Sequence, residues 1–476
     1  MIISFWPLRT HFDRVLVILL VTISFIGLSH KGIADGRSDP PNVVFILVDD
    51  LGWDDVGYLG SEIKTPNIDS LARSGIVLDH GYAFPICSPT RAALMTGHNP
   101  LRYGIDGAME NDAMLPEHLD LLPEYLRRSG YRTWMVGKWH LGMGVPEAMP
   151  HARGFDYYYG HLGGFIDFYT HVYFGGLDWQ RNGKSVREKG YATDLITREA
   201  IQLLSGHDGE SPFFLFLSYN APHTPLQYPP EAKYSYEEIE SKDRRVFAQM
   251  TTYLDSAIGE VVSALEERDF LENTLIVFMS DNGGNLKAGA HNGPLRDGKG
   301  SALEGGIRVP AFLAWKRGLV GNRTFDDPVF VQDWLPTLLA VAGVNYNVED
   351  FDGRSAWVAL ESGQSIVRSG PVMIGAEHSK AVFDWPWKLL RDETPGRGDQ
   401  LYNVKVDPTE QIDLANKHPE LVQKLGAELD ALPIRESRAA KGPKPESLFR
   451  DSSGDFDYDI RMPETRLPWA EAALAE

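Results

Sequence analysis

The chain has 476 residues, 43% of them hydrophobic and 24% charged, a composition that excludes a disordered chain or a bundle of membrane helices. Its net charge of −20 creates no field that attracts polyanions, which argues against nucleic acid as a partner. An anionic substrate would therefore need a local cluster of cations. The length allows a large core and two domains.

The first 34 residues have the pattern of a secretory signal peptide. Arg9 and Arg14 precede an apolar run over residues 15–28, and Gly32-Ile33-Ala34 then offers small residues to a signal peptidase. The run is shorter than the roughly 20 residues of a spanning helix, so we expect export without a stable membrane span, while retention as an anchor stays an open alternative. A single cysteine, Cys87, permits no intrachain disulfide, which favours bacterial export to the periplasm or the medium.

Residues 35–365 are expected to form one domain in which strands and helices alternate. Apolar, largely β-branched or aromatic runs typical of buried parallel strands occupy residues 42–48, 131–136, 213–217 and 274–279. A short strand is expected at 76–78, and helices at 66–74, 115–129, 193–204 and 242–268. The alternation predicts an α/β fold: a large, mixed, mostly parallel sheet flanked by helices, which binds ligands at the carboxyl ends of its strands.

Two later regions have a different texture. Residues 154–179 are rich in aromatic residues, glycine and histidine without a clear period, and we expect a long surface loop region there. From about residue 366, short strands at 372–374, 380–383, 387–390 and 400–402 precede a helix at 419–432. Residues 366–476 are therefore expected to form a smaller α+β domain with an antiparallel sheet, followed by a polar tail.

Polar residues follow each of the four buried strands. These residues are Asp49 and Asp50, Lys138 and His140, His223, and Asp281 and Asn282. Any one set could be ordinary turn chemistry, but four sets at one edge of a sheet indicate an active site. The carboxylate and amide oxygens suit Ca²⁺ or Mg²⁺, and we expect calcium. Arg91, Lys138 and Lys299 would be the cations around it, although by spacing alone Lys299 is better explained as a solvated loop lysine.

Cys87 is expected to stand at the start of a helix, with Ser88 as N-cap and Pro89 as the first helical residue. The free N–H groups and the dipole of a helix start would favour a thiolate or an anionic group beside residue 87, and Arg91 faces the same side one turn later. The alternative is a buried structural thiol, which is the commoner state of a free cysteine.

Six stretches of the sequence together resemble the motifs of the type I sulfatases of the alkaline phosphatase superfamily, and within that family those of the arylsulfatase B or N-acetylgalactosamine-4-sulfatase group. These stretches are residues 49–53, 87–97, 137–142, 221–223, 281–284 and 294–299. Cys87-Ser88-Pro89-Thr90-Arg91 is similar to the family consensus Cys-x-Pro-x-Arg, whose cysteine a formylglycine-generating or sulfatase-maturating enzyme converts to formylglycine (3-oxoalanine). The resemblance implies an alkaline phosphatase-like fold, one calcium ion and hydrolysis of sulfate monoesters.

The resemblance also implies roles for individual residues. The metal ligands would be Asp49, Asp50, modified Cys87, Asp281 and Asn282, and the catalytic residues Cys87, Arg91, Lys138, His140, His223 and Lys299. One hydroxyl of the hydrated aldehyde would attack sulfur, His223 with Lys299 would assist the departing alkoxide, and His140 would take the proton of the second hydroxyl to expel sulfate.

We expect the substrate to be a sulfated carbohydrate or polysaccharide bound across residues 157–174 and 285–296. Donors would come from His161, His171, His291 and Arg296, and flat apolar faces from Tyr158, Phe165, Tyr169 and Tyr173. The alternative that these aromatic residues merely pack the loop has nearly equal weight. Two other functions stay open: a phosphomonoester or phosphonate hydrolase on the same fold, and a non-catalytic glycan-binding protein whose Cys87 is never matured.

Overall fold

The computed structural model describes residues 40–109, 113–174, 176–230, 234–394 and 396–433. The expected signal peptide and the polar tail lie outside these residues. Within them, no helix has both the length and the apolar character needed to cross a membrane.

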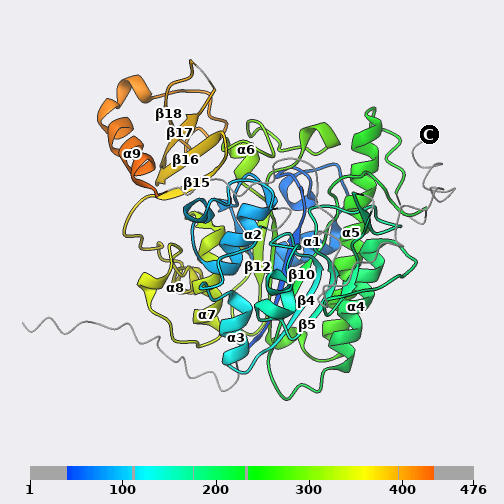
Figure 1. The fold of residues 1–476 in the computed structure, drawn as a ribbon. Helices are drawn as coiled ribbons and strands as arrows, with labels where there is room; N and C mark the ends of the chain where they lie inside the picture. Colours follow the sequence, from blue (N-terminus) through cyan, green and yellow to red (C-terminus); the bar gives the residue numbers. More distant parts are fainter. Residues whose placement is uncertain (1–39, 110–112, 175, 231–233, 395, 434–476) are drawn as a thin grey trace, which may run out of the picture.

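In the described part of the chain, a ten-stranded mixed sheet runs through the middle of the molecule (Figure 1). Its central strands are parallel and lie in the order β11 (Thr274–Ser280), β1 (Asn42–Val48), β10 (Phe213–Ser218), β4 (Arg132–Lys138) and β5 (Tyr157–His161). On one side β12 (Ala311–Ala314) and β2 (Ile76–Leu78) continue the sheet by antiparallel pairing, and the edge strand β13 (Arg323–Phe325) is parallel to β2. On the other side β8 (Gln180–Arg181) and β9 (Lys184–Ser185) pair antiparallel.

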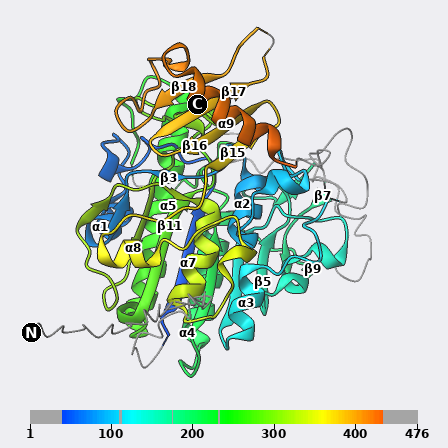
Figure 2. The same ribbon diagram turned by 90° about the vertical axis from the view of Figure 1, so that its left-hand side faces the viewer.

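Helices cover both faces of this sheet (Figures 1 and 2). One layer contains α1 (Pro66–Ser74), α4 (Ala192–Gly206) and α5 (Lys242–Glu267), and the other α2 (Cys87–Thr96), α3 (Leu122–Arg128), α7 (Trp334–Val341) and α8 (Trp357–Ser362). Because a strand covered on both sides has no solvent face, β1 is apolar and buried from Val43 to Val48. The predicted α/β fold is confirmed.

A second, antiparallel sheet forms from residues 372–403, described except for residue 395. It contains β15 (Val372–Ala376), β16 (Ser379–Asp384), β17 (Trp387–Asp392) and β18 (Gln400–Asn403). Helix α9 (Pro419–Ala431) buries Leu425 and Leu429 against this sheet. In Figure 1 this sheet lies beside α6 (Glu304–Ile307). Two smaller sheets each contain two strands: β3 (Gly81–Tyr82) pairs with β14 (Val329–Phe330), and β6 (Val172–Tyr173) pairs with β7 (Gly176–Leu177).

Two predicted elements within residues 115–179 were wrong. The helix expected at 115–129 begins only at Leu122, because Pro123 is tolerated in the first turn of a helix and not in its interior. The region 154–179 is not a surface loop throughout, since β5 pairs with β4 inside the main sheet and its Tyr158 and Tyr159 are fully buried. A strand buried on both faces shows no polar alternation, and here glycine and histidine also interrupt the apolar run.

Candidate active site

The carboxyl ends of the parallel strands bring the predicted residues together. Ligand atoms of Asp49, Cys87 and Asp281 all lie within 4.8 Å of one another, and so do those of Asp49, Asp50 and His223. All of these groups are buried or nearly so. Residues from four separate stretches of sequence therefore form one cluster.

Each carboxylate of the cluster is paired with one of the predicted cations. Lys138 Nζ donates to Asp49 Oδ2 at 2.5 Å, and Lys299 Nζ donates to Asp50 Oδ1 at 2.6 Å. Asp50 has φ 65°, a left-handed conformation that costs a non-glycine residue free energy and often marks a functional site. Burial opposes ionisation of Asp50, but Lys299 and His223 hold the pKa of its carboxyl below the usual value.

The third pair is Arg91 with Asp281. Nε and Nη2 of Arg91 donate to Asp281 Oδ2 at 3.1 and 2.9 Å, while Nη1 donates to Ser218 Oγ at 2.7 Å and to the Lys138 carbonyl at 2.9 Å. Burial, with Asp49 nearby, raises the pKa of Asp281 to about 6 although Arg91 lowers it. Ser218 was not among the predicted site residues. It could have been recognised as the one polar residue at the end of the apolar strand β10.

The cluster contains oxygens that no hydrogen bond satisfies. Among the described residues, Asp49 Oδ1, Asp50 Oδ2 and Asn282 Oδ1 are buried without a donor. A buried carboxylate or amide oxygen without a partner is costly, so each calls for a ligand. Oxygen donors of this kind fit a hard divalent cation such as Ca²⁺, so the residues present suit the metal that the sequence predicts.

Cys87 is the first residue of α2, which begins two residues earlier than expected, with Ile86 as N-cap. Ser88 does not cap this helix: its Oγ donates to the His140 carbonyl and accepts from Met109 N–H, both at 2.9 Å. The N-cap prediction was therefore wrong, and Ser88 instead ties α2 to the loop after β4. Burial raises the pKa of the Cys87 thiol more than Lys138 and Lys299 lower it, so the thiolate expected at the helix start is not favoured.

The two predicted histidines differ in their contacts. His140 has φ 59° and is 2% exposed, and neither ring nitrogen has a partner among the residues the structure describes. Burial and the neighbouring Lys138 hold its pKa well below the usual value. His223 Nδ1 lies 2.6 Å from the Thr224 carbonyl and so carries the proton, while Nε2 lies 3.5 Å from Asp50 Oδ2. Burial, then Lys299, lowers the pKa of His223 to about 3.

Several residues expected to contact a sugar are buried. His161 and His171 are stacked on the Trp179 ring at centroid distances of 6.3 and 4.5 Å, and both are no more than 1% exposed. His171 Nε2 also lies 3.1 Å from the Gly190 carbonyl. Tyr158 and Tyr173 are fully buried as well, so these four side chains pack in the interior and offer no surface to a sugar.

Other residues of the two loops remain nearer the surface. The Phe165 ring lies parallel to the His223 ring at 6.2 Å, and it also contacts Phe174, which is 56% exposed. His291 is exposed, and half-buried Tyr169 donates its hydroxyl to the Tyr228 carbonyl at 3.0 Å. The remaining candidate, half-buried Arg296, donates to the Glu410 carbonyl in the chain after β18.

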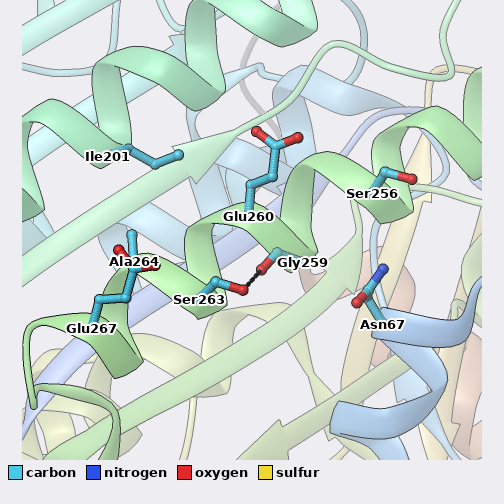
Figure 3. Close-up of a pocket in the computed structure, with 8 residues that line it drawn as sticks. All are labelled: Asn67, Ile201, Ser256, Gly259, Glu260, Ser263, Ala264 and Glu267. Carbon is cyan, nitrogen blue, oxygen red and sulfur yellow. Dashed lines mark hydrogen bonds between the residues drawn. The ribbon is translucent and has the colours of Figure 1, made fainter. Parts of the chain in front are cut away.

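A groove elsewhere on the molecule is large enough for a ligand but does not coincide with the strand-end cluster. This groove of about 440 Å³ lies between α1, α4 and α5, and Figure 3 shows its lining, to which Glu260 and Glu267 contribute carboxylates. None of its lining residues is basic, so it is poorly suited to an anion.

Comparison with known proteins agrees with this geometry. A family model described as Sulfatase matches residues 41–344. Arylsulfatase J of Mus musculus is 34% identical over 461 residues, covering 83% of this chain and 77% of that protein. N-acetylgalactosamine-6-sulfatase of Homo sapiens is 31% identical over 428 residues, covering 81% of this chain and 80% of that protein.

A solved structure has the same fold. "Crystal structure of Ps i-CgsB in complex with k-i-k-neocarrahexaose" has a TM-score of 0.79 and 34% sequence identity, covering 84% of this chain and 96% of that one. The family model spans more than half of the chain, and the strand-end cluster lies within the residues that it matches. The chain therefore belongs to the sulfatase family, as a type I sulfatase of the alkaline phosphatase superfamily and a sulfuric ester hydrolase.

Proposed function

We propose that this protein hydrolyses sulfate monoesters of a carbohydrate, with a formylglycine made from Cys87 and a bound calcium ion. The observation that carries the proposal is the convergence of Cys87 with three carboxylates, three cations and unsatisfied buried oxygens at the ends of parallel strands. The N-terminal pattern supports export, so we further propose a bacterial periplasmic or secreted enzyme that depends on a formylglycine-generating or sulfatase-maturating partner.

The roles follow from the contacts. Calcium, held by Asp49, Asp50, residue 87, Asp281 and Asn282, would offset the charge of the sulfate and hold one of its oxygens. Formylglycine would supply a hydroxyl of its hydrated aldehyde as nucleophile. Arg91 and Lys138, both fully buried and hydrogen-bonded, hold the nucleophile's surroundings rigid.

The remaining groups handle the leaving group and the proton. His223 and Lys299 both contact Asp50 and so lie close together. The Lys299 ammonium would protonate or stabilise the departing alkoxide, while neutral His223, whose proton is on Nδ1, would orient the leaving group. His140 is suited to take a proton from residue 87, because its ring nitrogens have no other partner among the described residues. General acid–base help of this kind contributes typically about 10² to 10⁴ in rate.

We propose that the sugar packs on the aromatic side chains beside His223. Phe165 stacks on the catalytic histidine and contacts Phe174, whose ring is more than half exposed. Apolar ring faces of this kind pack on the C–H faces of sugars. Ps i-CgsB, the structural relative at 34% identity, was solved with k-i-k-neocarrahexaose, which supports a carbohydrate as substrate here.

Maturation and metal binding can be tested directly. Mass spectrometry of the tryptic peptide 74–91 is expected to find formylglycine at position 87, and active protein with only a thiol there would contradict the proposal. Calorimetry is expected to detect inorganic sulfate binding to calcium-loaded protein and none after chelation. Asp281→Ala should remove calcium binding, because it deletes a carboxylate from a small ligand set.

Substrate class is tested with defined sulfated oligosaccharides, an aryl sulfate and the matching phosphate esters. Phe174→Ala is expected to raise KM for the oligosaccharide several-fold while sparing the aryl sulfate. Tyr234→Ala, at another exposed aromatic residue, is the matched control. Faster turnover of phosphate esters would favour the phosphatase alternative, and binding without turnover of any ester the glycan-binding alternative. If no sulfated saccharide outperforms the aryl sulfate, the carbohydrate assignment fails.

A further inference from the structure

The segment that carries Lys299 is attached to the C-terminal sheet. We call residues 296–306 the lysine segment. At its start, Arg296 Nη1 donates to the Glu410 carbonyl and lies 3.4 Å from the Tyr402 hydroxyl. Further along, the Ala302 N–H donates to Ser379 Oγ on β16 at 2.9 Å. Both ends of the stretch around Lys299 are thus tied to the second domain.

A buried charge cluster makes the third attachment. Lys388, on β17, is fully buried, and its Nζ lies 2.9 Å from Glu304 Oε1 and 2.8 Å from Glu410 Oε1. Glu304 accepts a further hydrogen bond from the Tyr82 hydroxyl at 2.9 Å, and its own N–H donates to Glu410 Oε2 at 2.8 Å. Burial lowers the pKa of Lys388, but the two carboxylates hold it above the usual value. One ammonium therefore bridges two carboxylates, and the next cation, Arg308 Nη1, lies 3.9 Å from Glu304 Oε2.

The backbone next to this cluster is in contact with the active site. Glu304 is the first residue of α6, and the following Gly305 N–H donates to the Arg296 carbonyl at 2.8 Å. The Gly283 N–H, directly after the predicted ligand Asn282, donates to the Gly306 carbonyl at 2.9 Å. A Cβ atom on Gly305 would come within 2.3 Å of the Asp297 carbonyl, so α6 packs here without spare room.

Lys299 has little freedom within this arrangement. Its N–H donates to the Gly284 carbonyl at 3.2 Å and its Nζ to Asp50 Oδ1 at 2.6 Å, while the next N–H, of Gly300, donates to the Pro85 carbonyl at 2.8 Å. Helix α6 packs against the residues on either side, since a Cβ atom on Gly306 would come within 2.5 Å of the Gly298 carbonyl and 2.0 Å of the Ser301 carbonyl. A displacement of α6 would therefore shift the ammonium of Lys299 relative to Asp50 and Cys87.

We propose that Lys388 is a positioning residue for Lys299: by pairing with both Glu304 and Glu410 it fixes α6, and through α6 it fixes the lysine segment at the active site. The inference rests on the proposed function, because it takes Lys299 to act on the sulfate ester. Without Lys388, two buried carboxylates would face each other without their ammonium, and the segment between them would move. The C-terminal domain is on this account part of the catalytic scaffold.

The test is a kinetic double-mutant cycle on a small aryl sulfate, with wild type, Lys299→Ala, Lys388→Met and the double variant. Lys388→Met is expected to lower kcat by roughly 10- to 100-fold with KM changed less than about twofold. In the Lys299→Ala background the same substitution is expected to cost less than about threefold, because its target is already gone. Near-UV circular dichroism checks that each variant is folded.

Two more variants keep the test decisive. Ser379→Ala deletes only the bond to Ala302, and it is expected to lower kcat a few-fold in wild type and not in Lys299→Ala, even if Lys388→Met fails to fold. Arg368→Met breaks another short ion pair, in which the Arg368 side chain is 14% exposed and its Nη2 lies 2.6 Å from buried Asp333, away from the lysine segment, and its effect should be equal in both backgrounds. Equal losses from Lys388→Met and Ser379→Ala in both backgrounds would overturn this inference alone. An unchanged rate in Lys299→Ala would overturn the role of Lys299 in the proposed function as well.

Discussion

Arg91→Met is expected to destabilise the protein by about 3–5 kcal/mol, the usual cost of removing one partner from a buried ion pair. Arg91 is fully buried and makes two bonds to Asp281, one to Ser218 and one to the Lys138 carbonyl. Methionine keeps the packing volume and supplies no donor. The loss therefore reports mainly the uncompensated carboxylate and the Ser218 hydroxyl oxygen, because the Lys138 carbonyl still accepts from Ser218 Oγ at 2.8 Å.

The assay is equilibrium urea unfolding in the presence of a chelator, so that metal binding adds nothing to the free energy of unfolding. Arg128→Met is the control, because its pair with Asp120 at 2.7 Å is about half exposed and should be worth only about 0–1 kcal/mol. Combining Arg91→Met with Asp281→Leu should recover much of the loss, since a neutral pair leaves no buried charge. A loss below about 1 kcal/mol for Arg91→Met alone would refute the reasoning.

Three further outcomes are expected. Gly137→Ala should lower the free energy of unfolding by on the order of 3 kcal/mol or more, because at φ +113° its Cβ would lie 1.8 Å from a carbonyl of β10. The control is Gly130→Ala, at φ +92° in open space, which should lower it by only about 1 kcal/mol in the same urea assay. Burial raises the pKa of Asp255 from 3.8 to about 6. The stability that its protonated form contributes is therefore fully present below pH 3.8 and is lost as the pH rises through 6. In urea unfolding across this window, the stability of Asp255→Asn should depend less on pH than that of wild type. His171→Ala should lower stability and affect sugar and aryl sulfates alike, because its ring is buried against Trp179, and a KM effect confined to the sugar would contradict this.

The central strands and the positions of the strand-end residues could be predicted from the sequence. A parallel strand buried on both faces must be apolar along its length, which makes 42–48, 213–217 and 274–279 unambiguous, and the chain after each strand emerges at one edge of the sheet. The structure confirms these strands and brings Asp49, Cys87 and Asp281 within contact.

What the sequence could not predict depends on long-range packing. Strand β5 shows no alternation of polar and apolar residues because it is buried along most of its length, including Gly160 and His161, and so has no solvent-facing side. Ser88 looks like an N-cap locally, but its hydroxyl bonds to the distant His140 carbonyl instead. Lys388 carries no motif at all, and its partner Glu304 lies 84 positions away in the chain.

The pairing of charges changes how the site must recognise an anion. The sequence suggested that Arg91, Lys138 and Lys299 form a positive cluster, yet the structure matches each of them with a carboxylate, Asp281, Asp49 and Asp50 respectively. The protein groups alone therefore give a site close to neutral, in a chain whose net charge is −20. The unsatisfied oxygens beside these pairs suit a divalent cation, and such a cation would supply the excess positive charge that a sulfate ester requires. On this reasoning the paired cations would orient the ester and the nucleophile, and attraction of the anion would depend on a divalent cation held by these oxygens.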